Sequence, residues 1–391
     1  MRIRRPVLTV YLIGLFQGLA LVALPAAATI LQSPSAYDLS SSQYGLLFLP
    51  QVMTAILGAL TVPALARRFS LARMLSVGLV ANTAAMALVL ASAAVDDQPV
   101  AYPMLLLATA ALGLGFGVTL SCISTYAGSF APDRREVALT SLNVLLGLGT
   151  ALSPLLVALF VGHAEWWYLP LLTAAGLGAL LVSVAVAPLG EPAAGDADQG
   201  GPRSAGVPRA FWVFAAALVA YGIGETMFGN WGTTLLVDAG ATATDAGYAL
   251  AAFWAAVTVG RLLIALTARR VRSTTVYVVL PWAIAGALLL ASQTTGDHGV
   301  LLFAFGGFAC SGFFPMTIGF GEAAFPADVE RSAGWLVAAY QVGYGLAAFG
   351  GGALQRAVAL SSLFAAAAVI AVLMGLLAPL IARRSRSVGA R

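Results

Sequence analysis

The chain has 391 residues, of which 60% are hydrophobic and only 9% are charged. Soluble domains carry about 25% charged residues, so this chain has too little charge for the surface of a cytosolic enzyme or a nucleic-acid-binding protein. The composition is that of a polytopic membrane protein, and the formal net charge of +4 fits arginine-rich cytoplasmic loops.

Twelve apolar segments bounded by charges, proline or glycine follow one another along the chain. A helix that crosses the core of a bilayer needs about 20 apolar residues, so the sequence predicts an all-α polytopic protein with twelve transmembrane helices. The predicted spans are 6–32, 43–66, 73–95, 100–128, 137–161, 166–188, 210–237, 243–268, 274–293, 299–325, 333–355 and 358–382. The first span is too long for the apolar region of a signal peptide, which has about 7–15 residues.

The arginines predict which side of the membrane each loop faces, because short cytoplasmic loops are enriched in basic residues. With twelve spans, 18 of the 20 basic residues fall on one side, and Arg261 and Arg356 are the exceptions. Both termini are therefore predicted to be cytoplasmic, in a multi-pass protein of the cell membrane.

A polar linker divides the spans into two sets of six. Residues 190–209 are rich in Gly, Pro, Ala and Asp, which is typical of a flexible connection. The linker separates a predicted N-terminal bundle, 1–189, from a predicted C-terminal bundle, 210–391. The bundles also match in sequence, since Gly147-x-Gly149 in the fifth span corresponds to Gly343-x-Gly345 in the eleventh. Such matches in the order of the spans favour a duplicated six-helix unit.

Six plus six spans, a polar central linker and cytoplasmic termini resemble the major facilitator superfamily. In that fold two six-helix repeats surround a solute site at mid-membrane. The loop from Pro63 to Arg73 resembles the family's Gly-x-Leu-Ala-Asp-Arg-x-Gly-Arg element. It departs from that element at Arg67, which stands in the place of the acid, and at Ser70, which stands in the place of the second glycine.

A narrower resemblance is to the fucose-permease-like sugar:proton symporters. The seventh span reads Tyr221-Gly-Ile-Gly-Glu225 followed by Trp231, the eighth ends in Gly260-Arg261, and the tenth contains Gly312-Phe-Phe-Pro315-Met, all similar to elements of that group. The acids of that group in the first and fourth spans are missing, and Gln17 occupies the middle of the first.

Glu225 lies in the middle of its span, about twelve residues from either end. A charge at that depth costs at least about 2.5–3.5 kcal/mol, and an intramembrane acid is by default a functional residue. Burial disfavours the ionised form, so the carboxyl group can be protonated in one conformational state and ionised in another. The sequence predicts Glu225 as the proton-coupling residue. The alternative is a permanently protonated side chain that bonds to a neighbouring helix.

Arg261 and Glu322 lie near the cytoplasmic ends of the eighth and tenth predicted spans. Paired charges are the usual solution inside membranes, so we expect an ion pair between them. The pair is predicted to be structural, and it can also act as a cytoplasmic gate that breaks on opening. A coupling role for Glu322 is the alternative.

Amide and aromatic side chains inside the spans are the predicted solute contacts. Amides offer both donors and acceptors, which suits hydroxyl-bearing or zwitterionic solutes. The candidates are Gln17, Gln51, Asn143, Tyr221, Asn230, Trp231, Trp254, Tyr340, Gln341 and Tyr344. For each, helix–helix contact is the alternative. Asn82 is set aside, because its span is more often peripheral in this fold.

These features predict a secondary transporter that moves a small polar organic solute, such as a sugar, by alternating access with proton coupling. A proton-coupled exporter of a drug or metabolite is the alternative. A membrane-embedded enzyme is disfavoured, because the spans contain no nucleophile–base pair and no metal-ligand spacing. The expected partners are the solute, protons and the bilayer; the protein is expected to act as a monomer, without cofactor, metal or nucleic acid.

Overall fold

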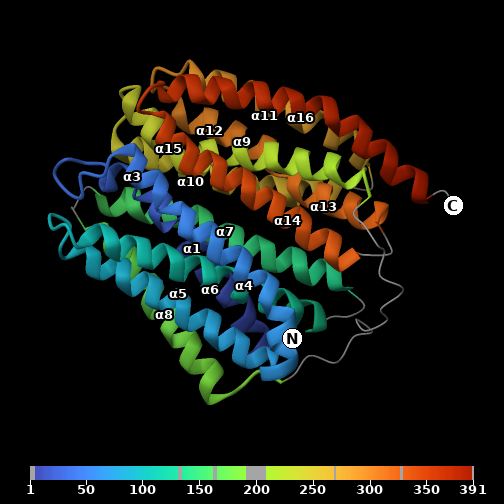
Figure 1. The fold of residues 1–391 in the computed structure, drawn as a ribbon, viewed down its shortest axis with the longest axis horizontal. Coiled ribbons are helices and arrows are strands. Elements are labelled where there is room, and N and C mark those ends of the chain that lie inside the picture. Colours follow the sequence, from blue (N-terminus) through green and yellow to red (C-terminus); the bar gives the residue numbers. More distant parts are fainter. Residues whose placement is uncertain are drawn as a thin grey trace. The chain divides into compact units, whose positions relative to one another are not determined.

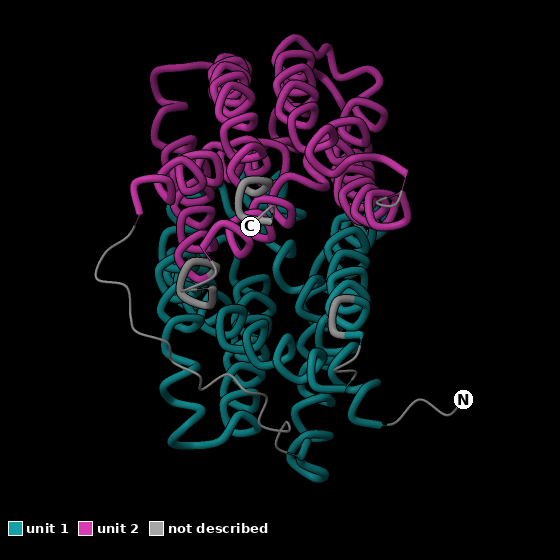
Figure 2. The backbone as a smooth tube through the Cα atoms, turned by 90° about the vertical axis from the view of Figure 1, so that its right-hand side faces the viewer, with its two compact units in different colours: residues 1–196 teal, residues 197–391 magenta. Residues whose placement is uncertain are grey.

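The computed structural model describes residues 5–130, 134–161, 165–190, 208–267, 270–325 and 329–389, and these contain helices but no β-strand. The chain divides into two compact units, 1–196 and 197–391 (Figure 2). This division falls within the predicted linker, most of which, 191–207, lies outside the described residues.

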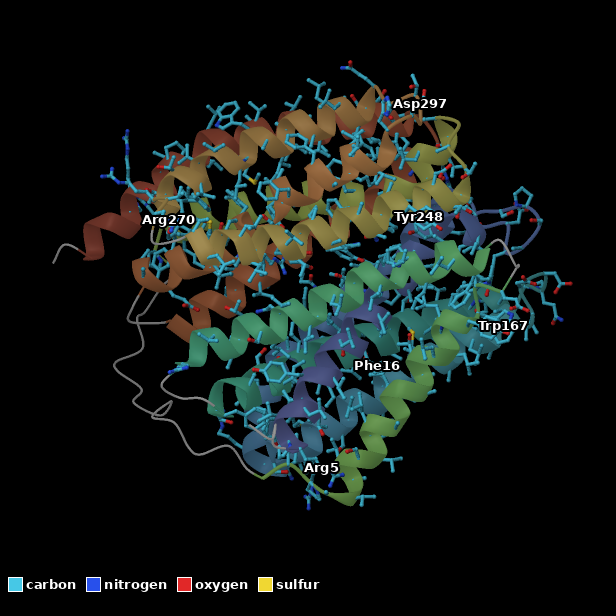
Figure 3. All side chains as sticks on the ribbon, turned by 180° about the vertical axis from the view of Figure 1, so that it is seen from behind. Arg5, Phe16, Trp167, Tyr248, Arg270 and Asp297 are labelled. Atoms are coloured by element: carbon cyan, nitrogen blue, oxygen red, sulfur yellow. The ribbon has the colours of Figure 1, made fainter. Side chains whose placement is uncertain are left out.

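Unit 1 is a bundle in which successive long helices run up and down (Figure 1). Arg5 and Trp167 mark opposite ends of this bundle (Figure 3), and the Nη2 group of Arg5 donates to the backbone and side-chain oxygens of Ser183, each at 3.2 Å. These bonds join the start of the first long helix to the end of the last. The helices are α1 (Arg5–Ala26), α2 (Ala28–Leu31), α3 (Ser41–Leu46), α4 (Phe48–Phe69), α5 (Leu71–Ala93), α6 (Ala101–Phe130), α7 (Arg135–Val161) and α8 (Tyr168–Val186).

Unit 2 contains α9 (Phe211–Asp238), α10 (Ala243–Thr267), α11 (Ser273–Ser292), α12 (Gly299–Cys310), α13 (Phe313–Ala324), α14 (Val329–Gly345), the π-helical turn η3 (Leu346–Gly350), α15 (Gly351–Leu354) and α16 (Leu360–Gly389). In the described parts of both units, eleven helical segments are long and apolar enough to cross a bilayer. The predicted span 333–355 is not among them, because it is divided into α14, η3 and α15. Glycines clustered at this division weaken a regular helix.

The same three helix pairings occur in each unit. In unit 1, α1 packs along α7, α4 along α6 and α5 along α8; in unit 2, α9 packs along α14, α10 along α12 and α11 along α16. Glycines allow the backbones to approach. A Cβ on Gly149 of α7 would overlap the Leu15 carbonyl oxygen of α1, and a Cβ on Gly343 of α14 would overlap the Val219 carbonyl oxygen of α9. The matching glycine motifs therefore make equivalent helix contacts in the two units.

Ser70, at the N-cap of α5, has φ 78° and ψ 150°, in a backbone region that is essentially restricted to glycine. The strain there costs a non-glycine residue about 1–3 kcal/mol. We expect Ser70→Gly to raise the midpoint of thermal unfolding in detergent, because glycine at an N-cap loses only about a few tenths of a kcal/mol relative to serine. Ser70→Ala should lower the midpoint, since it keeps the strain and loses the bond from the Arg73 N–H (3.4 Å). A lower midpoint for Ser70→Gly would refute the assignment of strain.

Candidate functional site

Glu225 lies on α9, which is buried on most of its surface, and only 5% of the side chain is exposed. Both carboxyl oxygens have a hydroxyl partner. The Tyr221 hydroxyl, one helical turn earlier, is 2.7 Å from Oε1, and the Tyr340 hydroxyl of α14 donates to Oε2 at 2.6 Å. The structure thus brings together three of the residues that the sequence singled out.

The close contact of α9 with α14 makes this cluster possible. A Cβ on Gly222 would lie 2.5 Å from the Tyr340 carbonyl oxygen, so only glycine fits there without displacement. Aromatic rings enclose the cluster, because Phe313 and Phe314 stack on Tyr221 with ring centroids 5.7 and 6.3 Å away. The carboxyl group is therefore held by two hydroxyls in apolar surroundings.

A helix break lies beside this cluster, between α12 and α13. Pro315 has no N–H to donate to the carbonyl of Ser311, four residues earlier. The Nε group of Arg261, on α10, donates to that oxygen at 3.2 Å. The neighbouring carbonyl oxygen of Cys310 lies 2.8 Å from the Tyr221 hydroxyl. Two side chains from other helices thus contact the carbonyls at the break.

Arg261 and Glu322 do not meet, although the sequence predicted an ion pair. Glu322 is exposed in the last turn of α13, and no ion pair joins these two described residues. Eleven residues separate Ser311 from Glu322, which is roughly 16 Å along a helix. A guanidinium group that binds at the break is too far away to reach this carboxylate.

A polar stripe follows one face of α9 beyond Glu225. Thr226, Asn230 and Thr233 share this face at helical spacing, and each is at most 3% exposed. The Asn230 amide donates to the Tyr344 hydroxyl at 3.2 Å. The two threonine hydroxyls are buried and have no partner among the described residues, and the same is true of Nε1 of Trp254 on α10. Trp254 lies against this stripe, because a Cβ on Gly229 would be 3.1 Å from its ring.

Trp231, by contrast, belongs to the packed interior. Its Nε1 donates to the Ala347 carbonyl at 3.0 Å, and the side chain is fully buried. Gln341 is half-buried on α14. Neither residue joins the Glu225 cluster through a described contact.

In unit 1, Gln17 pairs with Asn82, which is not among the solute contacts that the sequence predicts. The Asn82 amide donates to Oε1 of Gln17 at 2.6 Å and to the Thr119 hydroxyl at 3.1 Å, and Gln17 donates back to Asn82 at 3.3 Å. All three residues are fully buried. This amide cluster joins α1, α5 and α6, and Gly115 leaves the space that the Asn82 side chain occupies.

Gln51 and Asn143, the other two predicted solute contacts of unit 1, have no described bond to the cluster of Gln17, Asn82 and Thr119. Gln51 is buried on α4, and its Oε1 has no partner among the described residues. Asn143 is exposed on α7 and donates to the carbonyl of Leu139 in its own helix at 3.0 Å. The three predicted contacts of unit 1 are therefore not one cluster.

We expect Asn82→Leu to destabilise the protein by about 1–3 kcal/mol, because the buried amide of Gln17 would lose its partner. Thermal unfolding in detergent should show a lower midpoint. The double variant Gln17→Leu/Asn82→Leu should recover part of the loss, since neither amide is then left unpaired. Additive losses would contradict a direct coupling between the two side chains.

The family is decided by comparison with known proteins. A family model for the Major Facilitator Superfamily matches residues 7–296. The chain belongs to the major facilitator superfamily. No curated relative matches the chain at a significant level.

Solved structures of transporters share this fold at low sequence identity. A mutant of the nucleoside transporter NupG is 14% identical, with a TM-score of 0.76 over 96% of this chain and 100% of its own. A D-xylose-proton symporter is 17% identical, with a TM-score of 0.75 over 96% of both chains. The inward-open xylose transporter XylE from E. coli is 14% identical, with a TM-score of 0.75 over 95% of this chain and 94% of its own.

Major facilitator proteins are secondary transporters and not enzymes. Within the described residues, no three His, Cys, Asp or Glu side chains lie together in a way that could hold a metal ion. The chemistry of the described site is therefore that of one carboxyl group, several hydroxyls and amides, and one guanidinium group.

Proposed function

We propose that this major facilitator protein moves a small polar organic solute by alternating access, and that Glu225 carries the coupling proton. The observation that carries the proposal is the buried carboxyl group of Glu225, which has two hydroxyl neighbours and no ion-pair partner among the described residues. An acid inside a membrane-spanning helix is by default a functional residue, which favours a coupling role for this carboxyl group.

The polar stripe on α9 supports a hydroxyl-bearing solute. Buried polar atoms nearly always have a hydrogen-bond partner. The hydroxyls of Thr226 and Thr233 and the Nε1 of Trp254 have none among the described residues, and a solute hydroxyl is the partner that we propose for them. The ring of Trp254 also offers a face for a sugar or a base. The resemblance to fucose-permease-like symporters, and the structural likeness to a D-xylose-proton symporter and a nucleoside transporter, point to the same class of solute.

A proton-coupled exporter of a drug or metabolite is the second candidate. The aromatic residues near Glu225, among them Phe313 and Phe314, favour it, because flat apolar molecules stack on such rings. The two candidates differ in the direction of transport. A symporter accumulates solute toward the side that receives protons, whereas an antiporter moves it against the proton flow.

The proposal places both termini in the cytoplasm and treats the protein as a monomer. The arginine distribution carries the orientation. Removal of a C-terminal tag by protease in inside-out vesicles, and not in right-side-out vesicles, would support it. The opposite pattern would refute it.

The decisive experiment is a solute screen in proteoliposomes with an imposed pH gradient. The panel should contain pentoses, hexoses, nucleosides and flat cationic drugs. Accumulation of a pentose, hexose or nucleoside that collapses with a protonophore supports the leading proposal. Gradient-driven drug movement opposite to the protons supports the exporter, and transport indifferent to the gradient refutes proton coupling.

We further propose that Arg261 and Glu322 form a cytoplasmic gate in a conformation other than the one described. Arg261→Glu and Glu322→Arg should each slow transport, and the double variant should recover part of the rate. Initial transport rates in proteoliposomes measure this. Arg270→Glu combined with Glu322→Arg is the matched control, because Arg270 is exposed beyond the end of α10, and it should give no recovery. Equal rates for the two double variants would refute the gate.

A further inference from the structure

The contacts around Glu225 contain more oxygen–oxygen pairs than the two tyrosines have protons. Three short contacts are present: Tyr221 hydroxyl to Glu225 Oε1 at 2.7 Å, Tyr221 hydroxyl to Cys310 carbonyl oxygen at 2.8 Å, and Tyr340 hydroxyl to Glu225 Oε2 at 2.6 Å. All three distances are typical of O–H···O hydrogen bonds. Each tyrosine hydroxyl supplies one proton, and a carbonyl oxygen only accepts. Two tyrosine protons therefore cannot give each of the three contacts a proton of its own, and two contacts would have to share one in a weaker bifurcated bond.

A protonated Glu225 provides the missing proton. Its Oε1–H then donates to the Tyr221 oxygen, Tyr221 donates to the Cys310 carbonyl, and Tyr340 donates to Oε2. Every contact holds one hydrogen. The described conformation of unit 2 therefore fits the protonated carboxyl group better than the carboxylate, for which two contacts would share the single Tyr221 proton.

When Glu225 loses that proton to water, two hydrogens remain for the three contacts, so one contact is left without a hydrogen of its own. A carboxylate is the stronger acceptor, because hydrogen bonds to ionised groups are roughly twice as strong as neutral ones. Tyr221 then turns its single proton toward Oε1. Its oxygen is left facing the Cys310 carbonyl with lone pairs on both sides, so these two atoms repel each other.

We infer that Tyr221 transmits the protonation state of Glu225 to the break between α12 and α13. This inference rests on the proposed function, since it assumes that Glu225 exchanges a proton. Tyr221 is a positioning residue in this scheme: it links the carboxyl group to the Cys310 carbonyl at the break, next to the Ser311 carbonyl that accepts from Arg261. When Glu225 is protonated, the Tyr221 hydroxyl bonds α9 to the Cys310 carbonyl at the break. When Glu225 is ionised, that bond is lost.

Among the described residues, no other charged or titratable group near the cluster bonds to both Glu225 and the helix break. The charged and titratable neighbours are Arg261 from α10, Cys310 from α12, and Tyr340 and Tyr344 from α14. Tyr344 bonds to Asn230. Arg261 donates to Ser311. Tyr340 bonds to the carboxyl group and has no described bond to the break.

The chain offers a direct probe, because Cys122 and Cys310 are its two cysteines. In a Cys122→Ala background, cysteine labelled with ¹³C at the carbonyl gives one isotope-shifted infrared band, which belongs to Cys310. Its frequency falls when the carbonyl accepts a stronger hydrogen bond. The same spectra contain the carboxylic acid band of Glu225, which is identified by its loss in Glu225→Gln.

We expect the Cys310 band to move to lower frequency on acidification, together with the appearance of the Glu225 acid band. Tyr221→Phe should hold the Cys310 band at the higher frequency at every pH. Glu225→Gln should hold it at the lower frequency, since the amide N–H replaces the acid proton as donor to Tyr221. Tyr340→Phe is the matched control. It removes a hydroxyl from the same carboxyl group and should keep the pH-dependent shift.

Two outcomes would overturn the inference and leave the proposed function standing. One is a Glu225 band that titrates while the Cys310 band of the otherwise unchanged protein stays fixed, and this readout does not need Tyr221→Phe to fold. The other is a Tyr221→Phe protein whose Cys310 band shifts as before. If no acid band sensitive to Glu225→Gln titrates, Glu225 exchanges no proton, and the proposed coupling falls as well.

Discussion

Glu225→Gln is expected to abolish pH-gradient-driven accumulation of solute in proteoliposomes and to leave exchange of solute across the membrane intact. The amide has the size of the carboxyl group and keeps both contacts, because its oxygen accepts from Tyr340 and its N–H donates to the Tyr221 oxygen. The variant therefore retains the folded site but has no proton to release. Accumulation should fall to the level of liposomes in which the gradient has been collapsed.

The measurement compares uphill uptake with counterflow of labelled solute in the same vesicles. Asp297→Asn is the matched acid-to-amide control, because Asp297 is exposed in the loop before α12, at the far end of unit 2 from Arg270 (Figure 3). It should accumulate solute like the unmodified protein. Undiminished uphill transport by Glu225→Gln would refute the proton-coupling role. Loss of both uptake and counterflow would instead indicate a solute-binding or structural role.

The position of a residue along its helix could be predicted from the sequence. Hydropathy is enough to predict the helical membrane fold, and Glu225 does lie near the middle of α9, buried within unit 2. That position follows from counting along one helix at about 1.5 Å per residue. The side of the helix on which a residue faces its neighbours depends on packing with other helices, which a single sequence does not reveal.

Asn82 shows the cost of that missing information. The family resemblance implies a peripheral helix for this residue, yet Asn82 bonds to both Gln17 and Thr119. One signal was available. Gln17 lies twelve residues after the start of α1, Asn82 eleven after the start of α5, and Thr119 eleven before the end of α6. α1 and α5 are the first and third spans and run in the same direction, and α6 runs in the opposite one, so the three polar residues lie at similar heights and could have suggested the cluster.

The helix break at Pro315 was also within reach of the sequence, whereas its partners were not. A proline inside a span frees the carbonyl four residues earlier, so an unpaired Ser311 oxygen could have been expected. That Arg261 would bind it, in place of Glu322, could not. The partner of Arg261 depends on how α10 packs along α12, and the sequence alone does not reveal that packing.

Gly149→Ala is expected to cause a large loss of stability, although it adds a single methyl group. The added Cβ would overlap the Leu15 carbonyl oxygen of α1 and lie 3.0 Å from the Gly18 Cα. Backbone atoms cannot move aside as a flexible side chain can, so α1 and α7 must separate along their contact. Overpacking of this kind costs about 1–3 kcal/mol, and in a bundle held by close backbone packing it also removes neighbouring contacts.

The midpoint of thermal unfolding in detergent and the yield of monodisperse protein measure this effect. Gly286→Ala is the matched control, because Gly286 lies inside α11 and a Cβ there meets nothing within 4 Å. Alanine is the better helix former by about 1 kcal/mol, so this variant should be as stable as the unmodified protein or more stable. Opposite effects of one substitution at two helical glycines would show that the Gly147-x-Gly149 motif is required for contact between helices and not merely tolerated. Equal midpoints for the two variants would refute that role, and with it the physical basis of the glycine motif repeated in α14.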